Sequence, residues 1–238
     1  GRTKEKSNLK LNIFMGGRIA MRRAINILHA ERELFELTGR LRLKAHAPVE
    51  GPPPPGPILA TPLGAPKPPP GFIGSISHKE RLAAAVAMNM PPIFKRSGHI
   101  GVDIEKCTHN SAESLSRRLL TANEIASLDG MGGLFPVEEE ILLRFSFKEA
   151  IYKALNPFLK RYIEFHEAEV FPKPGGKVEI KLKLKTSEKF NVQAEWRRIE
   201  GKYWLTCVYA WEQVPVTGAA RTPQLHYPFA HGTDLDDI

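Results

Sequence analysis

The sequence predicts an α+β protein in which antiparallel sheets pack against helices. Helical periodicity covers residues 17–37 and returns after Pro136, where apolar side chains recur at three-and-four spacing. Apolar and polar residues alternate in four later segments separated by turn-forming residues: 168–171, 177–184, 190–196 and 203–211. Helices together with a run of antiparallel strands are typical of the α+β class.

The first hundred residues are expected to contain a helix, a loop and three strands. Proline dominates residues 48–71, which therefore form a loop that is neither helix nor central strand. Extended segments are expected at 72–77, 81–88 and 99–105. The alanines of 81–88 also favour a helix, but its short length and the prolines that follow it favour a buried strand.

Helix boundaries can be placed in the middle of the chain. The run from Thr121 to Glu124 has the capping-box pattern, in which side chains satisfy free amides at a helix start. A longer helix should begin after Pro136 with glutamates in its first turn, and stop before Pro157. Residues 213–238 are rich in turn-formers and acidic at the end, so a poorly ordered tail is expected.

Composition narrows the class of function. The chain has 238 residues and a net charge of +8, which suits an anionic partner. The basic residues form no long block and no repeat with aromatic residues, which weakens the case for nucleic acid. Two cysteines are too few for a disulfide framework or a four-ligand zinc site. The longest apolar stretch cannot span a bilayer and no secretory signal is visible. We therefore expect the cytoplasm and no membrane, or an organelle if a targeting segment has been removed.

Asp103 and Glu105 are a candidate metal-binding pair. They stand two residues apart on an expected strand, so both carboxylates leave the same face. Neighbouring carboxylates repel unless a cation lies between them, and hard oxygen ligands suit Mg²⁺. An isolated pair of this kind is more often a solvated strand end, so by itself it decides nothing.

Glu149 and Lys153 are four residues apart on one helical face. Glutamate followed by lysine at this spacing is also the favoured surface ion pair. The apolar residues around them make the turn unusual for a solvated face, so they are candidates for a third metal ligand and a phosphate contact. Ser77 and His78, at the end of an extended segment, can bind phosphate; a structural histidine is the alternative. A serine hydrolase is rejected because the strand–turn–helix nucleophile elbow is absent.

Three segments in this order resemble the core motifs of the 4′-phosphopantetheinyl transferases: Gly74-Ser-Ile-Ser-His78, Gly101-Val-Asp-Ile-Glu105 and Phe145-Ser-Phe-Lys-Glu-Ala-Ile-Tyr-Lys153. The upstream stretch from Gly17 to Ala24 resembles a segment of the siderophore-synthetase branch of that family. The resemblance runs from about Gly17 to Trp211. Phe145 stands where many members have tryptophan, and the strand expected before the first helix is missing or truncated.

The resemblance implies a pseudo-two-fold arrangement of two similar α/β halves with coenzyme A in the cleft between them. The first half would be residues 1–101, truncated at its N-terminus, and the second 102–212, carrying the metal site. Asp103, Glu105 and Glu149 would bind Mg²⁺, with Mn²⁺ as an alternative ion. Glu149 would be the general base. Phosphates would be gripped by a basic and polar set: Arg18, Arg22, Ser77, His78 and Lys153.

The implied reaction moves 4′-phosphopantetheine from coenzyme A to a serine of an apo acyl or peptidyl carrier protein and releases 3′,5′-ADP. The carrier would be acidic, and the enzyme a monomer. Two other functions stay open: a basic nucleic-acid-binding module, which would show steep salt dependence, and a degenerate transferase that keeps the fold as a scaffold. The intact set of three carboxylates and Lys153 argues against degeneracy. The sequence does not identify the carrier or its pathway.

Overall fold

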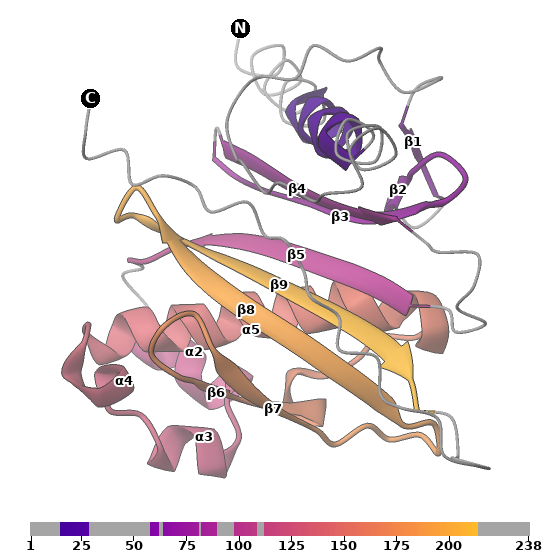
Figure 1. Ribbon diagram of the computed structural model, residues 1–238. Coiled ribbons are helices and arrows are strands. Elements are labelled where there is room, and N and C mark those ends of the chain that lie inside the picture. Colours follow the sequence, from indigo (N-terminus) through magenta and orange to yellow (C-terminus); the bar gives the residue numbers. More distant parts are fainter. Residues whose placement is uncertain are drawn as a thin grey trace, which may run out of the picture.

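A three-stranded antiparallel sheet with one long helix across its face forms the centre of the protein (Figure 1). Its strands are β5 (Gly98–Lys106), β9 (Tyr203–Glu212) and β8 (Phe190–Ile199), in the order β5-β9-β8. The helix is α5 (Val137–Leu159), and it contacts β5 and β9. The computed structural model describes residues 15–28, 58–61, 64–80, 82–89, 98–108 and 112–213.

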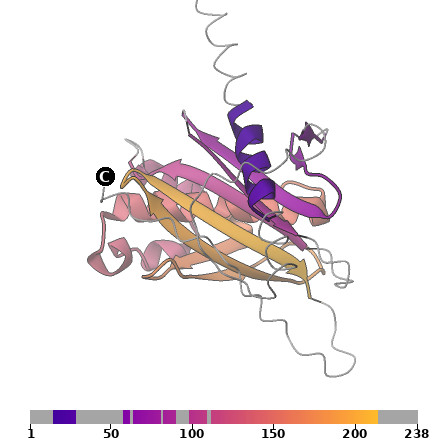
Figure 2. The same cartoon turned by 45° about the horizontal axis from the view of Figure 1, so that its top comes forward.

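A second antiparallel unit lies beside the central sheet. The hairpin of β3 (Phe72–Lys79) and β4 (Leu82–Asn89) is placed with β3 next to β5. A helix of residues 15–28 covers this hairpin on the side away from the central sheet (Figures 1 and 2). Met21 and Ile25, both completely buried, form the apolar contact between helix and hairpin. The central sheet with α5 and the β3–β4 hairpin with the helix of residues 15–28 thus each combine antiparallel strands with a packed helix.

Short elements complete the fold. A small hairpin precedes β3, three short helices connect β5 to α5, and a second hairpin follows α5 and borders β8. Their bounds are β1 (Leu59–Ala60), β2 (Pro66–Lys67), α2 (Ala112–Leu119), α3 (Ala122–Ala126), α4 (Gly130–Gly133), η1 (Phe165–Glu167), β6 (Ala168–Pro172) and β7 (Val178–Leu182).

The long helix approaches the sheet most closely at Gly101. A Cβ atom added there would lie 2.0 Å from the carbonyl oxygen of Ala150 and 2.8 Å from the amide nitrogen of Ala154. Both atoms belong to helix backbone, which cannot move aside as a flexible side chain could. Only glycine therefore allows α5 to lie against β5 at this depth, and the depth sets where the helix presents its polar side chains.

Gly101→Ala is expected to lower the free energy of unfolding by about 3 kcal/mol, the upper end of the usual cost of overpacking. The matched control is Gly16→Ala, where the added Cβ would meet Ala83 at an ordinary 3.7 Å. That change should stabilise the protein by about 0.5–1 kcal/mol, because glycine is unfavourable in a helix. Chemical denaturation of both variants measures the difference, and equal effects would contradict the packing argument.

The expected α+β class, with antiparallel strands and packed helices, is confirmed. The segments predicted as strands at 72–77, 81–88 and 99–105 correspond to β3, β4 and β5. The capping box of Thr121 and Glu124 is present at the start of α3. None of the described helices is both long and apolar enough to cross a bilayer. The division into halves at residue 101 stays a prediction. Residues 29–37, half of the proline-rich loop (48–57, 62 and 63) and the tail from 214 lie outside the described residues.

One helix boundary was wrong. Helix α5 does not stop before Pro157 but runs through it to Leu159. Proline lacks one N–H donor, and in the last turn this removes a single hydrogen bond from a helix that is otherwise held by burial on the sheet. The helix ends at Lys160, which adopts a left-handed conformation with φ 50° and donates its N–H to the Asn156 carbonyl at 2.8 Å.

Candidate active site

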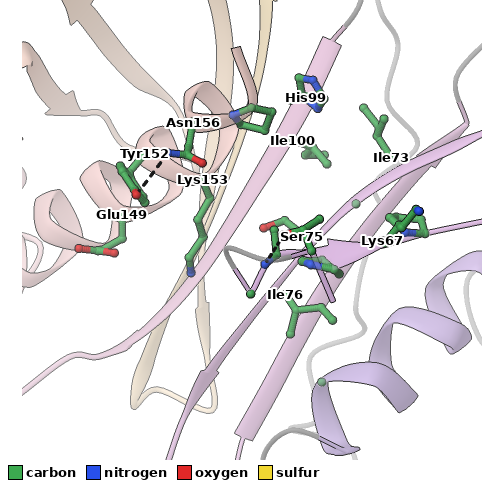
Figure 3. Close-up of a pocket in the computed structure, with 18 of the residues that line it drawn as sticks. Lys67, Ile73, Ser75, Ile76, His99, Ile100, Glu149, Tyr152, Lys153 and Asn156 are labelled. Atoms are coloured by element: carbon green, nitrogen blue, oxygen red, sulfur yellow. Dashed lines mark hydrogen bonds between the residues drawn. The ribbon is translucent and has the colours of Figure 1, made fainter. Parts of the chain in front are cut away.

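A cavity of about 1070 Å³ opens between β3 and the C-terminal half of α5. Its wall is formed by β3, the start of β5, the C-terminal half of α5, the small hairpin and the helix of residues 15–28. Figure 3 shows Glu149, Tyr152, Lys153 and Asn156 extending from α5, across from Ser75 and Ile76 of β3. Among the described residues that line it, Glu149 is the only acid, while the bases are Arg18, Lys67, His78, His99, Lys153, Lys160 and Arg161.

The polar residues of the motifs meet along the edge of β5 that faces β3. There, side chains form the hydrogen bonds to the β5 backbone that a neighbouring strand would otherwise form. The backbone N–H of Val102 donates to Ser75 Oγ at 3.1 Å, and the Val102 carbonyl accepts from Lys153 Nζ at 2.9 Å. These contacts satisfy backbone groups that a sheet edge would otherwise leave unpaired. They also fix β3 and α5 relative to β5, so polar side chains from all three elements meet.

Asp103 lies at the centre of this meeting point. Its Oδ1 accepts from Ser77 Oγ and from Lys153 Nζ, each at 2.8 Å, and its Oδ2 accepts from Ser146 Oγ at 3.0 Å. The side chain is nearly fully buried, so these bonds compensate for lost hydration of the carboxylate. The structure therefore joins three residues that the sequence placed in three separate motifs: Ser77, Asp103 and Lys153.

Glu105 follows Asp103 on the same strand and is equally buried. Its Oε1 accepts from the backbone N–H of Lys106 at 2.8 Å and forms an ion pair with Lys79 Nζ at 2.5 Å. Lys79 is the last residue of β3. A cationic side chain of the neighbouring hairpin thus already neutralises the second carboxylate of the Asp-x-Glu pair.

Glu149 is the carboxylate that faces the cavity. It lies one helical turn before Lys153 and is partly buried, and no described residue forms a hydrogen bond with its carboxylate. Burial raises the pKa of Glu149 above its usual value; the negative charge of Asp103 raises it further, Lys153 opposes, and Glu105 adds a smaller increase. The charges of Asp103 and Glu105 therefore act electrostatically on Glu149.

The predicted metal ligands are near one another, but they do not form a coordination group. Among the residues that the structure describes, no set of three or more histidine, cysteine or acidic side chains is arranged to hold an ion. The reason lies in the ion pairs: Lys153 and Lys79 bind the oxygens of Asp103 and Glu105. The assignment of Asp103, Glu105 and Glu149 to a metal stays a prediction.

Only some of the residues predicted to bind phosphate line the cavity. Arg18, His78 and Lys153 line the cavity, whereas Ser77 and Arg22 do not. Ser77 and His78 leave opposite faces of β3 because they are consecutive in a strand. Ser77 is buried against Asp103, and His78 is exposed. The Arg18 Nε donates to the Ile58 carbonyl at 3.1 Å, which fixes the direction of its side chain towards the small hairpin.

Two cavity lysines were not found from the sequence. Lys67 is on β2, inside the proline-rich stretch that gives no periodic signal. Lys160 follows the helix end that had been expected earlier, before Pro157. Arg161, beside it, is held by Glu167 at 2.8 and 2.6 Å. In the sequence, the one signal that could have identified Lys67 and Lys160 is that both are basic residues in or beside turns close to the motifs.

Lys148, in the middle of the third motif, is buried and holds elements of the fold together instead of facing the cavity. Its ammonium donates to Glu124 Oε2 at 2.9 Å and to the carbonyls of Phe165 and Ala168 at 2.7 and 2.6 Å. Both members of the pair are essentially inaccessible to solvent. Burial lowers the pKa of Lys148, which the charge of Glu124 counteracts. The residue ties α5 to α3 and β6, on the opposite side of the helix from Lys153.

Comparison with solved structures finds bacterial enzymes named ACPS. The apo ACPS of Chronobacterium ammoniagenes is 20% identical, with a TM-score of 0.37, and covers 50% of this chain and 100% of its own. The complex of that ACPS with CoA is 23% identical, with a TM-score of 0.38, and covers 50% of this chain and 99% of its own. The holo-(acyl-carrier-protein) synthase of Bacillus anthracis str. Ames, in complex with CoA (3′,5′-ADP), is 23% identical, with a TM-score of 0.34. It covers 48% of this chain and 96% of its own.

No protein of curated function matches the chain. A family model does match, over the segment that begins in β5 and ends in β9. This segment contains Asp103, Glu105, Glu149 and Lys153, whereas their partners Ser77 and Lys79 on β3 lie outside it. Residues 99–208 are similar to the 4′-phosphopantetheinyl transferase superfamily.

Proposed function

We propose that this protein transfers 4′-phosphopantetheine from coenzyme A to a serine hydroxyl of an apo carrier protein. The observation that carries the proposal is the convergence of Ser77, Asp103 and Lys153 with Glu149 at the wall of a large basic cavity. The residues of β5 and α5 in this group fall within the segment that matches the superfamily. A cavity of about 1070 Å³ is large enough for a nucleotide-sized ligand.

The donor set suits Mg²⁺, with Mn²⁺ as the alternative. Asp103, Glu105 and Glu149 offer hard oxygen ligands, and burial together with the charges of Asp103 and Glu105 raises the pKa of Glu149. These three residues would hold the ion. When bound, the ion would supply charge neutralisation on the diphosphate of coenzyme A.

Glu149 would act as the general base. Its Oε atoms would take the proton of the carrier serine as the serine oxygen bonds to the phosphorus next to pantetheine. The bond from that phosphorus to the bridging oxygen breaks, and 3′,5′-ADP leaves with that oxygen. A raised pKa makes Glu149 a stronger base than an ordinary carboxylate, which favours proton transfer near neutral pH. Lys153 would place positive charge beside the departing phosphate.

The basic wall of the cavity would bind the phosphates of coenzyme A. Arg18 and His78 lie on it as predicted, and Lys67 and Lys160 extend the same positive surface. Arg22 is adjacent to Arg18 on the helix of residues 15–28 but off the cavity, so it would act at most from the rim. Arginine can bind a phosphate through two parallel hydrogen bonds, which would orient the nucleotide as well as hold it.

Lys67→Met is expected to raise the KM for coenzyme A by roughly tenfold, the worth of one charge-assisted hydrogen bond, with kcat almost unchanged. The reason is that Lys67 lines the cavity far along the chain from the reacting carboxylates. Lys173→Met, on an exposed pair with Glu179, is the matched control and should leave KM as it is. A fall in kcat without a change in KM would contradict the phosphate-binding role.

The acceptor would be an acidic carrier protein of the acyl or peptidyl type. The net charge of +8 would steer such a partner to the cavity.

A mass-shift assay tests the proposal. The full chain is incubated with Mg²⁺, coenzyme A and several apo carriers, and each carrier is weighed by mass spectrometry. The expected result is the addition of one phosphopantetheine to at least one carrier, lost on removal of Mg²⁺ with a chelator and lost in Asp103→Asn. Transfer at the wild-type rate by Asp103→Asn would refute the site. No transfer to any carrier would refute the function.

A further inference from the structure

The Glu105 carboxylate already has a cation. Its Oε1 is 2.5 Å from the ammonium of Lys79, and the same oxygen accepts the backbone N–H of Lys106. A carboxylate oxygen has two lone pairs, so these two donors use the capacity of Oε1. Lys79 belongs to β3 and lies just outside the set of residues that line the cavity.

The two lysines that neutralise the acidic pair are held differently. Lys153 Nζ donates to three acceptors, Ser77, Asp103 and the Val102 carbonyl, and is fixed by them. Among the described residues, Lys79 Nζ contacts only Glu105, and its side chain is 34% exposed while that of Glu105 is 10% exposed. The ammonium of Lys79 is therefore less constrained than that of Lys153.

A second acceptor is within reach of Lys79 if it leaves. Glu80, next along the chain, is exposed and already pairs with Lys106 at 2.5 Å. The positive charge of Lys79 also acts on Glu80 across this turn. The ammonium can thus move from a buried carboxylate to an exposed one without losing an anionic neighbour.

We propose that Lys79 is an internal counter-ion that competes with the divalent cation for Glu105 and so sets the metal affinity of this site. The inference rests on the proposed function, because it assigns Glu105 to a metal. Two positive charges cannot share one buried carboxylate without repulsion, so binding of the ion must weaken or break the pair. Lys79 keeps Glu105 neutralised until the ion arrives.

The test compares Lys79→Met with Lys106→Met. Both remove an ammonium from a 2.5 Å ion pair at the same end of the sheet, but only Lys79 contacts Glu105 through its side chain. Mn²⁺ is the probe, and its binding is measured by electron paramagnetic resonance on the full chain, first alone and then with saturating coenzyme A. Thermal melting of each variant verifies that it is folded.

The expected result is a dissociation constant for Mn²⁺ about two- to fivefold lower in Lys79→Met, the scale of a partly exposed ion pair, and unchanged in Lys106→Met. Unchanged or weaker binding in Lys79→Met overturns the inference, as does equal tightening in both variants. Glu149→Gln distinguishes failure of the counter-ion role from failure of the proposed function. If Glu149→Gln abolishes Mn²⁺ binding while Lys79→Met has no effect, the proposed function stands and the counter-ion role fails. If the wild type binds no Mn²⁺ in either condition, both fail.

Discussion

Glu149→Gln is expected to reduce kcat for pantetheine transfer by about 10²–10⁴-fold, the usual contribution of a general base. The amide keeps the shape of the side chain but cannot accept the serine proton. Because Glu149 lines the cavity without a hydrogen bond from any described residue, the substitution breaks no contact in the protein. The loss should therefore fall on kcat and leave the fold intact.

The same substitution is expected to stabilise the protein at neutral pH. Burial raises the pKa of Glu149 in the folded state above that in the unfolded chain, so folding favours the protonated form. Protonated Glu149 contributes its full stabilisation at pH values below the pKa it has in the unfolded chain. This stabilisation is lost as the pH rises through the pKa that Glu149 has in the folded state. Glutamine, always neutral, carries no such penalty, and the melting temperature of the variant should exceed that of the wild type above this pH window and match it below.

Single-turnover kinetics and melting curves from pH 4 to 8 test both halves of this prediction. Glu138→Gln is the matched control, because Glu138 lies on the same helix but is exposed in its first turn. It should change neither quantity appreciably. A Glu149→Gln enzyme that keeps its rate, or that loses stability at neutral pH, would show that the carboxylate is a structural group instead of a base.

Lys148→Met is expected to lower the free energy of unfolding by about 3–5 kcal/mol, the cost of leaving one member of a buried ion pair without its partner. The substitution strands the Glu124 carboxylate in the interior and removes the donor to the carbonyls of Phe165 and Ala168. Chemical denaturation measures the effect. Any protein that still folds should bind coenzyme A with near-normal affinity, because Lys148 does not line the cavity.

The double variant Glu124→Gln with Lys148→Met separates the pair from the rest of the network. Removing the stranded charge should recover part of the lost stability, since the uncompensated carboxylate is the main cost. Lys173→Met, at an exposed pair of 3.8 Å, should change stability by well under about 1 kcal/mol. Additive losses in the double variant would contradict a direct coupling between Glu124 and Lys148.

The local structure of this protein could be predicted where a pattern in the sequence has a single local cause. Alternation at 99–105 placed Asp103 and Glu105 on one face of a strand, and both are buried side by side on β5. The pattern at Thr121 indicated a helix start because capping depends only on neighbours in the chain. The boundary at Pro157 failed because burial of α5 on the sheet outweighed the local preference of proline.

The role of individual residues within a motif could not be predicted in the same way. Lys148 and Lys153 look alike in the sequence, but the five-residue separation puts them on opposite sides of α5, one in the core and one at the cavity. Ser77 and His78 are consecutive, and the strand separates them as well. Which face of an element meets which neighbour depends on contacts between distant segments, and no spacing within one segment contains that information.

By itself, the sequence determined the α+β class, the strands and helices that carry the motifs, and the candidate acids and lysines, because these follow from periodicity and residue chemistry along the chain. Only the tertiary structure decided that Lys153 and Lys79 neutralise Asp103 and Glu105, and that Glu149 alone of the three acids lines the cavity. The physical reason is that ion pairing and burial depend on distance in space, and the edge of β5 brings together side chains up to 76 positions apart in the chain.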